Sequence, residues 1–210
     1  TPAAPAATTT PSLAEQTQSF QDQLRATETS LETLNEQLAK APRQIRDAEQ
    51  ALAHLRATPA VDVEKSLAGA DPAELEKRLN SQTQELSGWQ SELSDANSLV
   101  IAAQTRPERA QAEIASRQAR LQDVENLLSG TSGTKENGQP LAPERLAALK
   151  AEQAALKATI ELRRHELAGN SLLLNLGKAR RDLLTEQISR AQQETQALQG
   201  LLNNKRRQQS

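Results

Sequence analysis

This chain has 210 residues, of which 36% are hydrophobic and 25% charged, with one Trp, one Phe and no Cys, Met or Tyr. The lack of Cys excludes disulfide scaffolds and thiolate metal sites, and the scarcity of aromatic residues argues against a β-sheet fold. The formal net charge of −2 is too small to indicate a nucleic-acid or membrane partner. The remaining composition, rich in Ala, Leu, Gln, Glu and Arg, is typical of long helices and coiled coils.

Residues 1–11 are rich in Pro, Ala and Thr, so we predict a disordered leader of the kind that often follows a removed export signal. A helix is predicted over 12–57, because Ser12 and Glu15 have the spacing of a capping box. Pro42 interrupts this helix without changing its phase, and we expect a kink or a short break there. The apolar residues follow the 3-4 spacing of a coiled-coil seam, which requires a partner helix: Phe20, Leu24, Leu31, Leu34, Leu38, Ile45, Leu52 and Leu55.

The middle of the chain contains two further helix starts. Residues 58–70 carry a Pro and a Gly and are interpreted as a connection. Asp71 and Pro72 then have the types preferred at a helix cap and at the first helical position, which predicts a helix over 71–104. A new start near Pro107 predicts a third helix over 106–129.

The segment 129–143, with three Gly and two Pro, is the clearest loop in the chain. A helix is predicted over 143–168 and another over 170–206, because Gly169 suits the position after a last helical turn. The apolar seam keeps its phase across Gly169, so one continuous helix over 144–206 is the alternative. The seam of this region includes Leu149, Leu156, Leu184, Ile188, Ala191, Leu198 and Leu202. The predicted fold class is all-α: an elongated antiparallel bundle of coiled-coil-like helices over 12–207.

Charge is unevenly distributed along the helices. Residues 58–105 carry 3 basic and 8 acidic side chains, whereas residues 171–210 carry 7 basic and 3 acidic ones. We favour the interpretation that these two segments lie side by side. The alternative is that Lys205, Arg206 and Arg207 approach an anionic surface.

The sequence contains no metalloprotease, phosphate-loop or serine-hydrolase motif. His54 and His165 are interpreted as surface residues, and Trp89, which follows Gly88, as a core residue, with a partner-binding hot spot as the alternative. We therefore predict no catalytic, cofactor-binding or metal-ligating residue and no enzyme. No uncharged run approaches the roughly 20 residues that a membrane-spanning helix requires, and no aromatic and basic pattern indicates nucleic acid.

Two stretches carry a family resemblance. The first is Arg106-Pro107-Glu108-Arg109-Ala110-Gln111; the second runs from Glu166-Leu167-Ala168-Gly169-Asn170 through Leu173, Leu176 and Arg180-Arg181-Asp182 to Leu201-Leu202-Asn203-Asn204-Lys205-Arg206. In this order, over roughly 12–207, the chain resembles the periplasmic N-terminal domain of the large MscS-like mechanosensitive channels of Gram-negative bacteria, the MscK/MscM subfamily. The loop at 129–143 matches no pattern of that family.

The resemblance implies an inner-membrane channel, homoheptameric, that opens under membrane tension and releases solutes during hypoosmotic shock. This segment would be its periplasmic extension, with structural and regulatory roles, no cofactor, and other channel subunits and envelope components as partners. The pore residues would lie outside it. The alternatives are a helical efflux-pump adaptor, against which the lack of flanking strand signals counts, and a periplasmic coiled-coil activator of an envelope enzyme.

Overall fold

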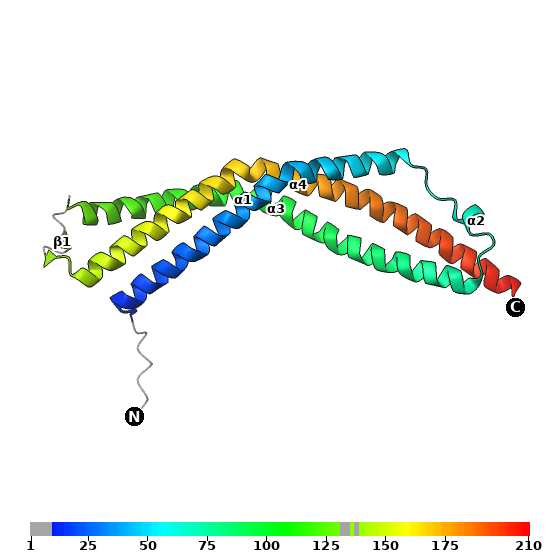
Figure 1. Ribbon diagram of the computed structural model, residues 1–210, viewed down its shortest axis with the longest axis horizontal. Helices are drawn as coiled ribbons and strands as arrows, with labels where there is room; N and C mark the ends of the chain where they lie inside the picture. Colours follow the sequence, from blue (N-terminus) through cyan, green and yellow to red (C-terminus); the bar gives the residue numbers. More distant parts are fainter. Residues whose placement is uncertain (1–9, 131–134, 137–138) are drawn as a thin grey trace, which may run out of the picture. The chain divides into compact units, whose positions relative to one another are not determined.

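The computed structural model describes residues 10–130, 135–136 and 139–210. Three long helices account for most of these residues (Figure 1). The elements in chain order are α1 (Leu13–Ala57), α2 (Val63–Ser66), α3 (Pro72–Ser129), β1 (Lys135–Glu136), β2 (Gln139–Pro140) and α4 (Pro143–Gln208). The predicted all-α class is confirmed. The leader assigned to residues 1–11 lies outside the described residues except for positions 10 and 11.

The helices α1, α3 and α4 begin at the positions that their capping residues predicted. The backbone N–H of Glu15 donates to the Ser12 hydroxyl (3.1 Å), and that of Ser12 donates to the Glu15 carboxylate (3.3 Å), completing the capping box of α1. At the start of α3, the Asp71 carboxylate accepts from the backbone N–H of Glu74 (2.9 Å). Pro143 is the first residue of α4, a position where its missing N–H costs no helical hydrogen bond.

The helix break predicted near Pro107 is wrong, because α3 is one helix in place of the expected pair 71–104 and 106–129. A proline inside a helix costs about 3 kcal/mol, since one hydrogen bond is lost and the ring crowds the preceding turn. Ala103 and Ala110, on either side of Pro107, are both buried. An unbroken helix keeps Ala103 and Ala110 on the buried face of α3. The free energy gained by burying the apolar residues on both sides of Pro107 offsets the destabilisation that the proline causes.

The break predicted near Gly169 is also wrong, and the continuous-helix alternative is correct: α4 runs through 143–208 without interruption. A glycine in a helix interior costs only about 1 kcal/mol relative to alanine. Leu162 and Leu173, which lie on the two sides of Gly169, are both buried. A helix end at Gly169 would take one of these leucines out of register with the seam.

The connection at 58–70 contains a short helix, α2, which was not predicted from its sequence. The Asp62 carboxylate caps α2 by accepting from the backbone N–H of Lys65 (3.2 Å). Val63 is 2% exposed and joins Ala70 in a cluster with Leu198 and Leu202 of α4. The connection therefore supplies core residues as well as linking α1 to α3. In α1, the helix continues through Pro42, so a full break there is excluded, whereas the kink stays a prediction.

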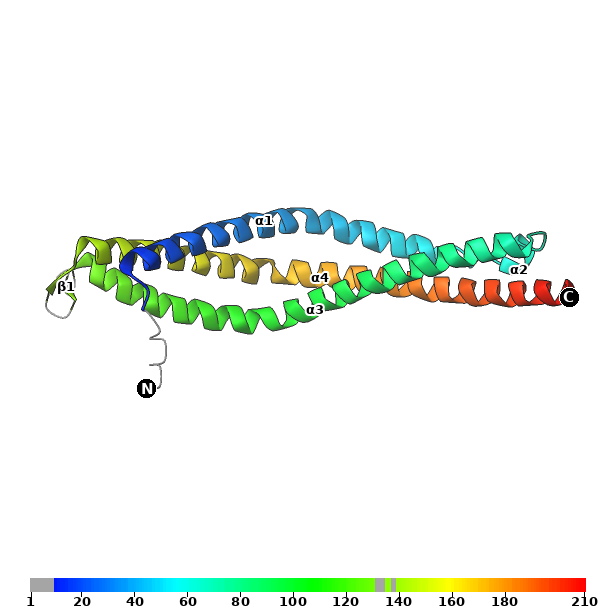
Figure 2. The same cartoon turned by 90° about the horizontal axis from the view of Figure 1, so that it is seen from below.

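The described chain divides into two compact units, each formed from parts of all three long helices. Unit 1 comprises the described residues within 1–37 and 105–170, and unit 2 comprises residues 38–104 and 171–210. In unit 1, the first half of α1 lies beside the end of α3 and the start of α4 (Figures 1 and 2). Its core contains Val124 of α3 with Leu149 and Leu156 of α4.

In unit 2, the end of α1 and the start of α3 pack along the second half of α4 (Figures 1 and 2). Here α3 is antiparallel to α4, whereas α1 and α4 run in the same direction. The predicted seam of α4 is buried in this unit at Leu184, Ile188, Ala191, Leu198 and Leu202. The seam pattern thus identified the inward face of α4 correctly.

The loop predicted at 129–143 corresponds to the connection between Ser129, the last residue of α3, and Pro143, the first residue of α4. Gly130 ends α3 with a φ of 73°, the left-handed conformation that favours glycine after a helix. Beyond it, β1 and β2 pair as an antiparallel two-stranded ladder with Lys135 opposite Pro140 and Glu136 opposite Gln139. Residues 131–134 and 137–138 of this loop lie outside the described residues.

Candidate functional site

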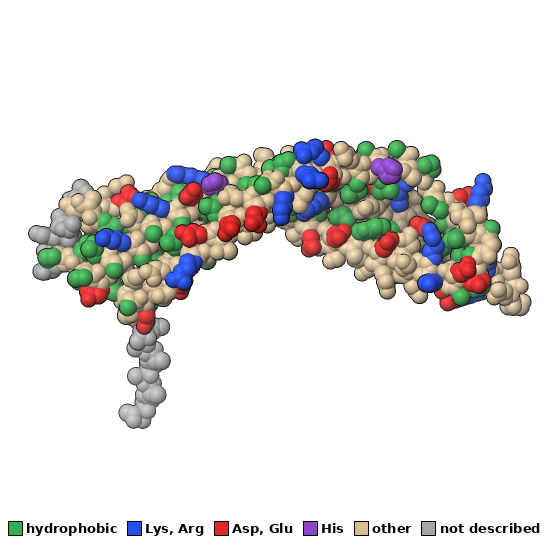
Figure 3. Space-filling model, in the orientation of Figure 1, with side chains coloured by type: hydrophobic (Ala, Val, Ile, Leu, Met, Phe, Trp, Pro, Cys, Tyr) green, Lys and Arg blue, Asp and Glu red, His purple; other side chains and the backbone are tan. Residues whose placement is uncertain are grey.

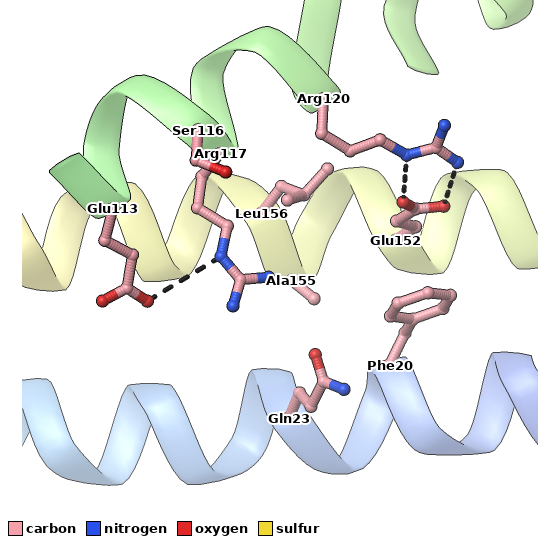
Figure 4. Close-up of a pocket in the computed structure, with 9 residues that line it drawn as sticks. All are labelled: Phe20, Gln23, Glu113, Ser116, Arg117, Arg120, Glu152, Ala155 and Leu156. Atoms are coloured by element: carbon pink, nitrogen blue, oxygen red, sulfur yellow. Dashed lines mark hydrogen bonds and ion pairs between the residues drawn. The ribbon is translucent and has the colours of Figure 1, made fainter. Parts of the chain in front are cut away.

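A charged hollow of about 380 Å³ lies in unit 1 among its three helices (Figure 4). Its charged residues are on α3 and α4, whereas α1 contributes an aromatic ring and an amide. The lining residues are Phe20 and Gln23 of α1, Glu113, Ser116, Arg117 and Arg120 of α3, and Glu152, Ala155 and Leu156 of α4. This hollow combines opposite charges with apolar side chains, which makes it the candidate site of unit 1.

The hollow is bounded at one end by a fork-like ion pair between α3 and α4. Arg120 donates from Nε to Oε1 of Glu152 (2.5 Å) and from a terminal guanidinium nitrogen to Oε2 (3.0 Å), as Figure 4 shows. Glu152 is only 8% exposed, so removal of Arg120 would leave a mostly buried carboxylate without its cation. Both carboxylate oxygens accept hydrogen bonds from a planar guanidinium, an arrangement that fixes orientation more firmly than a single contact.

A second cluster of ion pairs lies beside the hollow. The guanidinium of Arg163 bonds Glu113 of α3 (2.8 Å) and Glu166 of its own helix (2.8 Å), while Glu113 also faces Arg117 at 3.7 Å. Burial by itself would lower the pKa of Arg163, but the hydrogen bonds and charges of Glu166 and Glu113 outweigh it and raise that pKa above its ordinary value.

These contacts pair each charged side chain of the hollow with an opposite charge. Arg120 neutralises Glu152, and Glu113 faces both Arg117 and Arg163. The arrangement holds α3 and α4 in one antiparallel register. The sequence gives no local signal for it, because the paired residues lie far apart in the chain.

Unit 2 contains a more apolar groove of about 480 Å³. Trp89 lines it and is half-buried, so the indole is neither a fully buried core residue nor free of the bundle. Val61 on its rim is 57% exposed, which leaves the groove open to solvent. Two contacts connect α4 to the neighbouring segments at this groove: Arg190 donates to the carbonyl oxygen of Thr58 (2.7 Å), and Glu194 pairs with Arg78 of α3 (3.2 Å).

In unit 2, α3 and α4 approach each other closely at Gly177. A Cβ added to this residue would lie 2.9 Å from Cγ2 of Val100 and 3.5 Å from the carbonyl oxygen of Ala96. Gly88, which precedes Trp89, has nothing within 4 Å of an added Cβ. Of these two glycines, Gly177 is therefore the one that permits close helix packing.

The two histidines do not form a site together. His54 is exposed in unit 2, and His165 is 42% exposed in unit 1, with Nε2 3.6 Å from a carboxylate oxygen of Glu161. Among the described residues, no group of three or more His, Asp and Glu side chains is placed to hold a metal ion.

The basic end of α4 is engaged within the chain. The ammonium of Lys205 donates to the carbonyl oxygens of Ala68 (2.6 Å) and Ala70, and Arg206 pairs with Glu76 of α3. The acidic segment 58–105 and the basic segment 171–210 thus lie side by side, as the charge pattern predicted. The alternative, in which Lys205, Arg206 and Arg207 approach an anionic surface, is weakened because Lys205 and Arg206 are engaged in these contacts within the chain. Figure 3 shows acidic and basic side chains interspersed over the face it draws.

The fold and these contacts define a class of protein: a helical bundle stabilised by apolar seams and interhelical ion pairs. The family model for the mechanosensitive ion channel porin domain matches residues 3–210, so this chain belongs to that family. This is a family of ion-channel domains and not of enzymes, and the resemblance drawn from the sequence is confirmed.

A curated relative supports the same assignment. The chain is 32% identical over 177 residues to the mechanosensitive channel MscK of Escherichia coli (strain K12). The match covers 82% of this chain but only 15% of that channel, so the chain spans a small part of its relative's length. No solved structure matches the chain. Of the helices in the described part, none is long and apolar enough to cross a membrane.

Proposed function

We propose that this chain is the periplasmic extension of a tension-gated channel in a Gram-negative inner membrane, where it serves as a structural and regulatory module and helps protect the cell against hypoosmotic shock. The observation that carries this proposal is the family match over residues 3–210. The identity to MscK over most of this chain supports it independently.

The internal contacts suit a mechanical role. In unit 1, α3 and α4 are held by two interhelical guanidinium–carboxylate pairs, Arg120–Glu152 and Arg163–Glu113. In unit 2, the same helices are held by Arg78–Glu194 and by the close contact at Gly177. Sliding one helix past the other would break these contacts, so each unit resists shear along its helices. Such a module can act as a spacer, as a wall around a pore entrance, or as a lever.

The partners that this proposal implies are other copies of the same channel subunit. The resemblance points to a homoheptamer in the full-length parent, and envelope components are further candidates. A helical adaptor or an activator of an envelope enzyme is the competing function. No contact in the described residues favours either of these, so they enter as outcomes of the experiment.

The test is an in-frame deletion of residues 12–207 from the gene that encodes this chain, in a strain lacking other mechanosensitive channels. Patch-clamp recording would measure the membrane tension at channel opening, and hypoosmotic downshock would measure survival. We expect a changed opening tension and reduced survival. An unchanged tension and survival, or a gene without multiple membrane spans, would overturn the proposal in favour of an adaptor or an activator.

Two point variants sharpen the test. Gly177→Leu disturbs the packing of unit 2, whereas Gly88→Ala changes a glycine with open space around it. We expect Gly177→Leu to reproduce part of the deletion phenotype and Gly88→Ala to behave as the wild type. Hydrolytic activity in the purified domain would contradict the non-enzymatic assignment.

A further inference from the structure

The apolar groove of unit 2 combines aliphatic walls with an aromatic ring. It lies among the end of α1, the connection that follows α1, α3 and α4, all of them within unit 2, and its volume is about 480 Å³. Leu55 of α1, Val61 of the connection and Ala191 of α4 supply aliphatic surface, and Trp89 of α3 supplies the ring. A groove of this size and composition is typical of small-molecule sites in proteins.

The indole of Trp89 is accessible from this groove. Trp89 is half-buried, and together with Gln187 it also lines a second hollow of about 440 Å³ between α3 and α4. Because Trp89 borders both spaces, its side chain stands between them and can contact a molecule in either one. Aromatic faces attract cations, and the indole ring attracts them most strongly among the aromatic side chains.

The carboxylate of Glu85, next to this ring, carries a charge that the chain does not balance. Glu85 lines the same groove and precedes Trp89 by one helical turn, so the two residues are neighbours on one face of α3. Glu85 is exposed and forms no ion pair with any other residue that the structure describes. Residues 79–105 contain no Lys or Arg, so α3 offers no cation within reach of this carboxylate.

The other charged side chains of the groove are paired. Arg190 bonds Glu186 (3.2 Å) and the carbonyl oxygen of Thr58 (2.7 Å), and Glu194 pairs with Arg78 (3.2 Å). These contacts leave Glu85 as the source of an uncompensated negative charge in the groove. They also connect α4 to the segment after α1 and to α3, so the walls of the groove are held in place before any ligand arrives.

The second hollow is less suited to a cation. It is lined by Glu92 and Asp95 of α3 but also by Arg180 of α4, which is exposed and forms no ion pair within the described part of the chain. The guanidinium of Arg180 would repel a cation and offset the charge of one of the two carboxylates. The combination of an indole with an unbalanced carboxylate therefore favours the groove that contains Glu85.

We propose that the groove of unit 2 binds a small organic cation, with a quaternary ammonium group at Trp89 and Glu85 and an alkyl group against the aliphatic walls. A quaternary ammonium suits this site because the ring and the carboxylate both attract its charge, whereas its methyl groups require no hydrogen-bond acceptor. This inference goes beyond the proposed channel function and does not depend on it.

Trp89 itself reports on binding, because the chain has no other Trp and no Tyr. Its fluorescence is followed while the 210-residue chain is titrated with hexyltrimethylammonium, hexanol or hexanesulfonate, which share an alkyl chain and carry a positive, no or a negative charge. We expect a saturable change with the cation, at least about fivefold weaker binding of hexanol, and the weakest binding of hexanesulfonate. No saturable change with the cation, or binding of hexanol or hexanesulfonate as tight as that of the cation, would overturn the proposal.

Charge variants then locate the cation. Glu85→Gln should weaken binding of hexyltrimethylammonium about threefold to fivefold and leave binding of hexanol unchanged. Glu49→Gln is the matched control, since it removes the same charge from an exposed position of unit 2 outside the groove, and should leave both affinities unchanged. Wild-type affinity in Glu85→Gln, or a larger loss in Glu92→Gln, which alters the second hollow, would contradict the assignment.

Replacement of the ring tests its part in binding separately. Trp89→Leu removes the fluorescent reporter, so its affinity for hexyltrimethylammonium is measured by isothermal titration calorimetry, after circular dichroism has shown that the variant is helical. We expect at least about a fivefold loss of affinity. Wild-type affinity in folded Trp89→Leu would overturn the role of the indole, and Glu85→Gln, an exposed and conservative change, decides the proposal where Trp89→Leu does not fold.

Discussion

Gly177 of α4 lies so close to Val100 of α3 that a single added methyl group would meet Cγ2 of the valine at 2.9 Å. Valine in a helix strongly prefers one rotamer, so its methyl group cannot easily turn away. This contact sets how closely the two helices approach in unit 2. It also makes Gly177 a residue whose replacement has a predictable sign.

Gly177→Ala should destabilise the protein by about 1 kcal/mol and Gly177→Leu by about 2–3 kcal/mol, because overpacking outweighs the gain in helix propensity. Gly88→Ala is the matched control and should stabilise by up to about 1 kcal/mol, since nothing lies near its added Cβ. Urea unfolding followed by circular dichroism at 222 nm measures both. Equal stabilisation by alanine at the two positions would contradict the close contact.

Arg120→Met should destabilise unit 1 by about 2–3 kcal/mol, because it leaves the buried Glu152 carboxylate without its partner. Glu152→Gln should cost less, about 1 kcal/mol, since the partly exposed Arg120 can turn towards water. A double-mutant cycle isolates the pair. The more exposed Lys157–Glu125 pair, 3.8 Å apart, is the control and should show a coupling below about 0.5 kcal/mol. Equal coupling energies for the two pairs would contradict the prediction that the buried Arg120–Glu152 pair stabilises unit 1 more than an exposed pair does.

Arg163→Lys should cost about 1 kcal/mol, because an ammonium cannot offer the planar fork that bonds Glu113 and Glu166 at once. The pKa of Arg163 is raised, so its contribution to stability is complete below the ordinary pKa of arginine and is lost only as the pH rises through the raised value. The stability difference between wild type and Arg163→Met should therefore stay constant from about pH 7 to pH 10. A difference that shrinks over this interval would show that Arg163 loses its proton there.

Lys205→Met should loosen the segment around α2, because the ammonium donates to the carbonyl oxygens of Ala68 and Ala70. The expected cost is about 1–2 kcal/mol, typical of hydrogen bonds from a charged donor. Amide hydrogen exchange should accelerate in residues 63–75 and remain unchanged in unit 1. Arg207→Met, two residues further on, is the control and should leave the exchange of residues 63–75 as it is. Unaltered exchange in Lys205→Met would mean that this contact is not formed in solution.

Local signals predicted much of this fold. The capping box at Ser12, the cap at Asp71 and the proline at position 143 each act within one helical turn, so the sequence is sufficient to locate them. The seam positions Leu149 and Leu198 are indeed among the most buried side chains of the described residues. Periodicity succeeds here because it reports which face of a helix must avoid water.

Local signals failed where packing outweighed them. Pro107 and Gly169 both have the character of helix ends, yet the apolar residues on either side remain buried in phase and keep α3 and α4 continuous. The short helix α2 was missed because Val63 becomes a core residue only when it meets Leu198 and Leu202 of α4. No window of neighbouring residues contains that information.

By itself, the sequence determined that this protein is built from long helices, where most of them begin and which face of each is apolar, since these properties depend on residues within a turn or two of each other. It also carried the family relationship, because whole stretches of residues match. Only the tertiary structure decided that α3 continues through Pro107 and α4 through Gly169. It also decided that Arg120 pairs with Glu152 and that Gly177 packs closely against Val100. These outcomes depend on the free energy of contacts between distant segments, which arise only when the chain has folded.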